Sequence, residues 1–159
     1  MNWLFWAPLA AALAHIFEEF VLPGGFADWD RAYRPGFRKS VTPRFHVFIN
    51  GMLVLFCVSV GANGPVPIIG AAMWLTLTAL LASNTGFHIV GAVQSKRYSP
   101  GVVTGICLYI PLAVYGYVHF LRNGSASAGT AVGAAILGGS YHVWAFLAHA
   151  RRSGLPGSQ

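Results

Sequence analysis

Five long apolar stretches limit this chain to the folds that a membrane allows. They run roughly over residues 3–22, 44–62, 66–93, 100–121 and 127–150. A helix needs about 20 mostly apolar residues to cross the hydrocarbon core of a bilayer. Charged residues make up only 9% of the chain, whereas a soluble domain typically carries about 25%. The sequence therefore predicts an all-α integral membrane protein, a bundle of five transmembrane helices.

Proline and glycine mark the ends of these stretches, as in Pro23-Gly24-Gly25 and Ser99-Pro100-Gly101. Such residues end helices and form turns. We expect one membrane domain over residues 1–152, followed by a disordered tail over residues 153–159. Small residues in the last stretch, including Gly133, permit close helix contacts, so an oligomer is left open.

The basic residues predict the orientation of the spans. Five lie in the 24–44 connection, two in the 94–99 loop and two at the C-terminal end, whereas Arg122 alone lies in a loop on the other side. Cytoplasmic loops carry the excess of Lys and Arg. We therefore expect the N-terminus outside and the C-terminus in the cytoplasm, in a membrane of the bacterial inner-membrane type. The net charge of +6 flanks apolar stretches, which favours contacts with membrane lipids and argues against nucleic acid as a partner.

The 24–44 connection has the pattern of an amphipathic segment. Phe26, Trp29, Tyr33 and Phe37 recur at three- and four-residue spacing, with basic residues between them. This pattern is typical of a short helix lying in the membrane interface, and Pro35 should end it. We expect an interfacial anchor between spans 1 and 2. The alternative is a lid over an opening in the bundle.

Polar residues inside the apolar stretches fall at matching depths. The HxxxN pattern in the second stretch mirrors NxxxH in the third, as two antiparallel helices require. Ionisable groups inside a span face the bundle interior and mark functional sites. We therefore expect four spans to build one site in the cytoplasmic half. Its shallow layer holds Glu18, Glu19, His46, His88 and His149, and its deep layer holds His15, Asn50, Asn84 and His142.

His15, Glu18 and Glu19 form the motif HxxEE, and positions i, i+3 and i+4 share one helix face. This motif, with Asn84-x-x-x-His88 and the C-terminal histidines, resembles the HXXEE family of membrane proteins, which is largely uncharacterised. The resemblance implies a membrane protein of about five spans and gives no reaction.

The polar cluster favours a metal-dependent enzyme that acts on a lipophilic small molecule. Mixed His and carboxylate ligands suit iron or zinc, and one or two ions would offset the cost of burying two glutamates. Iron would imply an oxidoreductase, as in di-iron helix bundles, and zinc a hydrolase. The expected ligands are His15, Glu18, Glu19, His46, His88, His142 and His149, with His15, Glu18 and Glu19 catalytic and Asn50 and Asn84 in supporting contacts.

Two alternatives stay open. A metal-free acid–base enzyme, an isomerase, cyclase or epoxide-opening hydrolase, would use Glu18 or Glu19 as proton donor, because burial and a neighbouring carboxylate keep a glutamate protonated. A proton or metal-ion transporter would need a polar path through the other half of the bundle, which the sequence offers weakly. His119, at the outer end of the fourth stretch, should play no part in the site.

Overall fold

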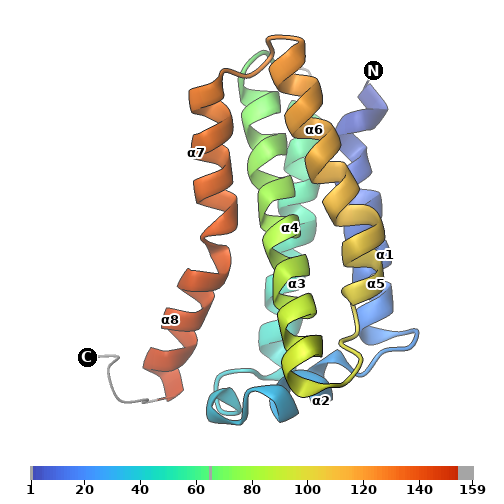
Figure 1. The fold of residues 1–159 in the computed structure, drawn as a ribbon, viewed down its shortest axis with the longest axis vertical. Coiled ribbons are helices and arrows are strands. Elements are labelled where there is room, and N and C mark those ends of the chain that lie inside the picture. Colours follow the sequence, from blue (N-terminus) through green and yellow to red (C-terminus); the bar gives the residue numbers. More distant parts are fainter. Residues whose placement is uncertain (1, 65, 154–159) are drawn as a thin grey trace.

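The computed structural model describes residues 2–64 and 66–153, and this part of the chain is a helical bundle without a strand (Figure 1). Four helices within it are long and apolar enough to cross a membrane. The all-helical prediction is confirmed, but the predicted number of five spans is wrong. The four candidate spans are α3 (Pro43–Asn63), α4 (Ile69–Ser95), the continuous helix Val102–Arg122 and the helical segment Ala128–Arg152.

The first apolar stretch is the one that falls short. It begins as a 3-10 turn, η1 (Asn2–Trp6), and continues as α1 (Ala7–Phe20), which has 14 residues. An α-helix of that length spans about 21 Å, against about 30 Å of hydrocarbon. Pro8 explains the irregular start, because it has no N–H to donate to the carbonyl of Leu4. The indole Nε1 of Trp74 donates to that carbonyl instead, at 3.2 Å.

The central helix of the bundle is α4, which contacts α3, α6 (Ile110–Arg122), α7 (Ala128–Gly139) and α8 (Tyr141–Ser153) (Figure 1). Two glycines allow α6 and α7 to approach α4 closely. A Cβ at Gly116 would overlap the buried ring of Trp74, and one at Gly138 would overlap the backbone of α4. The half of the bundle around Trp74 is consequently a packed apolar core.

The last two candidate spans are both irregular. The third consists of α5 (Val102–Thr104), a π-helical turn η3 (Gly105–Tyr109) and α6. Pro111 follows this turn and removes one helical donor, and π-turns are frequent near functional sites.

The fourth candidate span is interrupted between α7 and α8, and α8 lies at the end of the bundle where α2 (Phe26–Tyr33) lies (Figure 1). Ser153 still belongs to α8, and the rest of the predicted tail lies outside the described residues.

The connection between α1 and α3 crosses that end of the bundle (Figure 1). It forms α2 and the short turn η2 (Pro35–Phe37), with the predicted break before Pro35. Phe26, Trp29 and Phe37 are buried against the bundle, and a Cβ at Gly91 of α4 would come within 2.5 Å of the Trp29 ring. The aromatic face of this segment thus packs on the end of the bundle.

Candidate functional site

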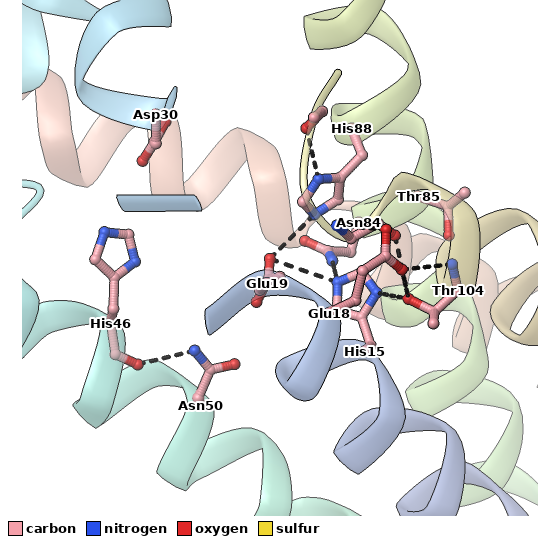
Figure 2. Close-up of polar contacts among 12 residues, drawn as sticks. His15, Glu18, Glu19, Asp30, His46, Asn50, Asn84, Thr85, His88 and Thr104 are labelled. Atoms are coloured by element: carbon pink, nitrogen blue, oxygen red, sulfur yellow. Dashed lines mark hydrogen bonds and ion pairs between the residues drawn. The ribbon is translucent and has the colours of Figure 1, made fainter. Parts of the chain in front are cut away.

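Glu19 lies between two histidines from different helices (Figure 2). Its Oε1 is 3.5 Å from His15 Nε2 on α1 and 3.2 Å from His88 Nε2 on α4. All three residues are buried, with 5% of Glu19 and 1% or less of each histidine exposed. One ligand atom from each lies within 4.8 Å of the others. This group, His15, Glu19 and His88, is called the triad below.

The other ring nitrogen of each triad histidine has a hydroxyl partner. His15 Nδ1 lies 2.9 Å from Thr104 Oγ1, and His88 Nδ1 lies 2.9 Å from Ser99 Oγ. Such outer contacts orient imidazole rings and fix which nitrogen faces a ligand. Both Nε2 atoms are thereby directed to Glu19.

Glu18 points away from Glu19 and toward the start of the third span (Figure 2). Its Oε1 accepts hydrogen bonds from the backbone N–H groups of Gly101 and Val103, at 2.9 and 3.1 Å, and from the phenol of Tyr98. Its Oε2 accepts from the N–H of Thr104 at 2.7 Å and from its hydroxyl at 2.5 Å. A carboxylate at this place satisfies the free N–H groups of a helix N-terminus and complements its dipole.

Tyr98 contributes to the same arrangement from the loop before the helix. Burial, followed by the hydrogen bond to Glu18 and the negative charge of Glu18, raises the pKa of the Tyr98 phenol to about 12. The phenol therefore stays protonated and donates to the carboxylate.

Gly101 forms the wall of the triad opposite the cavity. Its φ of +100° lies in the left-handed region that favours glycine. A Cβ there would come within 2.8 Å of both His15 Cε1 and His88 Cε1, and within 3.1 Å of Glu19 Cγ. The backbone at residue 101 thus packs directly on the triad while its N–H binds Glu18.

A cavity of about 510 Å³ opens beside the triad. Its polar end lies beneath α2, and its apolar part follows α3 and α4 toward the middle of the bundle. Met52 and Leu55 of α3 line it while being 48% and 60% exposed, so the cavity reaches the outer face of α3. The predicted site residues along its wall are His15, Glu19, His46, Asn50, Asn84, His142 and His149.

Residues from α1, α3, α4 and α8 thus lie around one cavity. The residues divide into different environments, however. The Nε2 atoms of His46 and His142 are buried without a hydrogen-bond partner among the described residues. His149 Nδ1 instead lies 2.9 Å from Ser40 Oγ, close to η2.

The two predicted supporting asparagines also differ. Asn84 Nδ2 lies 3.0 Å from His15 Nε2 and so contacts the triad directly. Asn50 Nδ2 donates to the carbonyl of His46 one turn earlier on α3, at 3.0 Å.

The sequence interpretation missed five residues near the site. Asp30 and Arg34 of α2 line the cavity as a bidentate pair, with N–O distances of 2.7 and 2.8 Å. Tyr98 and Thr104 donate hydrogen bonds to Glu18. Thr104 and Ser99 are the hydroxyl partners of the two triad histidines. A signal for the last three existed, because Ser99-Pro100-Gly101 marks a helix start whose free N–H groups attract a carboxylate.

The triad has the donor chemistry of a metal site. Zinc and iron take two histidines and one carboxylate while keeping positions open. Metal–ligand bonds of about 2.0–2.2 Å place neighbouring ligand atoms roughly 3–3.5 Å apart, and the two measured N–O separations fall there. Among the described residues no other group of His, Cys, Asp or Glu has this arrangement. Glu18, His46, His142 and His149, which were predicted as ligands, lie outside it.

Comparison with protein families gives a match that covers most of the chain. A family model described as a protein of unknown function with HXXEE motif matches residues 6–116, which include the motif, α4 and the start of the third span. No curated protein and no solved structure matches the chain significantly.

Proposed function

We propose that this chain, which belongs to the HXXEE family, is a membrane-embedded, metal-dependent enzyme that acts on a lipophilic small molecule. The observation that carries the proposal is the meeting of His15 Nε2, His88 Nε2 and Glu19 Oε1 beside a largely apolar cavity. Buried carboxylates need a compensating cation or proton. Within the triad, a single divalent metal ion would supply the compensating positive charge.

The metal is iron or zinc, and each implies a different reaction. Iron(II) held by two histidines and a carboxylate is typical of enzymes that oxidise organic substrates, whereas zinc with such ligands activates water for hydrolysis. The ion would take the Nε2 lone pair of His15, so the Asn84 amide would have to move away from that nitrogen. Glu19 would remain ionised and the two histidines neutral.

The cavity supports a lipid-soluble substrate. Exposed residues of α3 at its rim, Met52 and Leu55, would face acyl chains if α3 crosses the bilayer. A molecule dissolved in the membrane would then enter sideways, with its reactive end near the triad and its apolar part along α3 and α4. Ligand cavities of drug-sized molecules measure about 300–1,000 Å³, which includes this one.

The charge distribution supports the predicted orientation. The 24–44 connection, the loop before Gly101 and the end of α8 lie at one end of the bundle, and the N-terminal end of η1 lies at the other (Figure 1). Nine of the 10 Lys and Arg residues belong to the first end. We place this end, and the polar end of the cavity, at the cytoplasmic face of a bacterial-type inner membrane, with membrane lipids around the spans.

A metal-free acid–base enzyme is the second candidate, and the short N–O distances within the triad support it. Glu19 at 3.2 Å from His88 Nε2 is close enough to exchange a proton with that ring. Glu19 would then be the proton donor, because the carboxylate of Glu18 already accepts hydrogen bonds from N–H groups at the helix start.

Elemental analysis of protein purified without a histidine tag separates the two candidates. The metal proposal predicts about one iron or zinc per chain, lost in His88→Ala and retained in His119→Ala, which alters a histidine far from the cavity. Wild-type protein without metal that also fails to bind added Fe²⁺ or Zn²⁺ would overturn it and leave the acid–base candidate.

A further inference from the structure

The contacts of Glu18 determine where its neighbours carry their protons. Three of its donors are backbone N–H groups, which can only donate. The fourth is the Tyr98 phenol, whose proton stays in place because its pKa is raised to about 12. Both oxygens of Glu18 thus accept hydrogen bonds from groups that donate, which is the arrangement of a carboxylate.

Besides the ring of His15, Thr104 has two acceptors within reach of its one hydroxyl proton. Its Oγ1 lies 2.5 Å from the carboxylate oxygen Oε2 of Glu18 and 3.3 Å from the carbonyl oxygen of Gly101. A hydrogen bond to a charged carboxylate is shorter and about twice as strong as one to a neutral carbonyl. The proton therefore points to Glu18, and only lone pairs of Oγ1 remain for other partners.

His15 must then donate to Thr104. Its Nδ1 lies 2.9 Å from that Oγ1, and two lone pairs cannot form a hydrogen bond, so the proton is on Nδ1. A neutral imidazole with a proton on Nδ1 has its lone pair on Nε2. Nε2 is the atom that faces Glu19 at 3.5 Å and that the Asn84 amide approaches at 3.0 Å.

We propose that Glu18 and Thr104 are positioning residues that hold His15 in the Nδ1–H tautomer and so present its Nε2 lone pair at the triad. The use of that lone pair for metal rests on the proposed function, whereas the tautomer itself does not. The inference gives each glutamate of the HxxEE motif a separate task. Glu18 sets the tautomer through Thr104, and Glu19 faces the ligand.

Thr104→Val is the variant that isolates this role. It keeps the shape of the side chain and the backbone N–H that binds Glu18 at 2.7 Å, so the helix start stays capped, and it removes only the hydroxyl. Thr104→Ser restores a hydroxyl. Thr78→Val is the control, because Thr78 is a buried threonine whose hydroxyl donates to carbonyls of its own helix, far from the triad.

The first readout is the affinity for Zn²⁺, measured by competition with a chromophoric chelator. Loss of an outer partner of a metal-bound histidine typically weakens binding about 10–100-fold. We expect that loss in Thr104→Val, recovery to within about threefold of wild type in Thr104→Ser, and wild-type affinity in Thr78→Val. Wild-type affinity in Thr104→Val, or an equal loss in Thr78→Val, would overturn the inference.

The second readout does not need a metal. Nitrogen NMR of metal-free protein with ¹⁵N-labelled histidine, with the His15 signals assigned by their absence in His15→Gln, reports which ring nitrogen carries the proton. We expect the Nδ1–H tautomer in wild type and in Thr104→Ser, and a shift toward Nε2–H in Thr104→Val. An Nε2–H tautomer in wild type, or an unchanged spectrum in Thr104→Val, would refute the role. If wild type binds no Zn²⁺ but shows the Nδ1–H tautomer, the proposed function fails and this inference stands.

Discussion

Glu18 and Glu19 are adjacent in the sequence, yet they belong to two different regions of the molecule. Glu18 lies in the junction between α1 and the start of the third span, where five donors surround its carboxylate. Glu19 lies at the cavity, where two imidazole nitrogens approach it. One residue turns an α-helix by about 100°, so neighbouring glutamates on α1 face different partners. The comparison shows that a shared motif need not mean a shared role.

The strongest test of this division is the substitution of Glu19. Glu19→Gln removes the one carboxylate of the triad, and a neutral amide binds Fe²⁺ or Zn²⁺ poorly. We expect metal affinity to fall by more than about 100-fold, beyond the range for loss of an outer partner. The folded protein should persist, because no negative charge then needs compensation. Titration with Zn²⁺ and thermal unfolding in detergent measure the two effects, and unchanged affinity would contradict the division.

Glu18→Gln should have the opposite profile. It removes the charge that five backbone and side-chain groups bind, and each such charged hydrogen bond contributes about 1.5–3 kcal/mol. We expect a loss of roughly 3 kcal/mol in the free energy of unfolding, with a smaller effect on metal affinity than in Glu19→Gln. If the two variants changed stability and affinity alike, the glutamates would not have separate tasks.

Gly101→Ala tests the residue that contacts both Glu18 and the triad. A non-glycine residue at φ +100° costs about 1–3 kcal/mol, and the added Cβ would press on both histidine rings. Thermal unfolding should show the strain, and Zn²⁺ titration should show weaker binding because the rings are displaced. Gly124→Ala is the control, since Gly124 also has a positive φ but no atom lies within 4 Å of its Cβ position. Equal metal affinity in both variants would show that residue 101 does not shape the triad.

Much of this architecture could be predicted from the sequence. The spacing of His46, Asn50, Asn84 and His88 placed the second and third apolar stretches at matching depth, and residues of both line the cavity. The different partners of Glu18 and Glu19 could not be predicted, because Glu18 binds Thr104, which lies 86 residues away in the chain. The first apolar stretch was predicted to be a span, because hydropathy alone does not reveal the 3-10 turn that Pro8 causes at its start.

The roles of His46 and His88 also separate in the structure. Both were predicted to be essential ligands, but only His88 belongs to the triad, whereas His46 lines the cavity. We expect His88→Ala to lose bound metal and His46→Ala to keep it within about tenfold, because His46 acts from outside the triad. Elemental analysis after dialysis compares them, and loss of metal in both would enlarge the metal site to α3.

The smallest effect is expected at His119. It lies on α6 at the opposite end of the bundle, where its Nε2 is 3.1 Å from Asn123 Nδ2. Surface substitutions of this kind change stability by about 0.5 kcal/mol or less. His119→Ala should therefore match wild type in metal content and thermal unfolding. A loss of metal would place a ligand outside the triad.

X-ray absorption spectroscopy of the metal-loaded protein tests the central claim most directly, because it reports the atoms bound to the ion. With Zn²⁺ or Fe²⁺ we expect two imidazole nitrogens and a carboxylate oxygen at about 2.0–2.2 Å, with both imidazoles retained in Glu18→Gln. A spectrum of the wild type with fewer than two imidazole nitrogens, or loss of an imidazole in Glu18→Gln, would contradict the assignment of His15, Glu19 and His88 as the metal ligands.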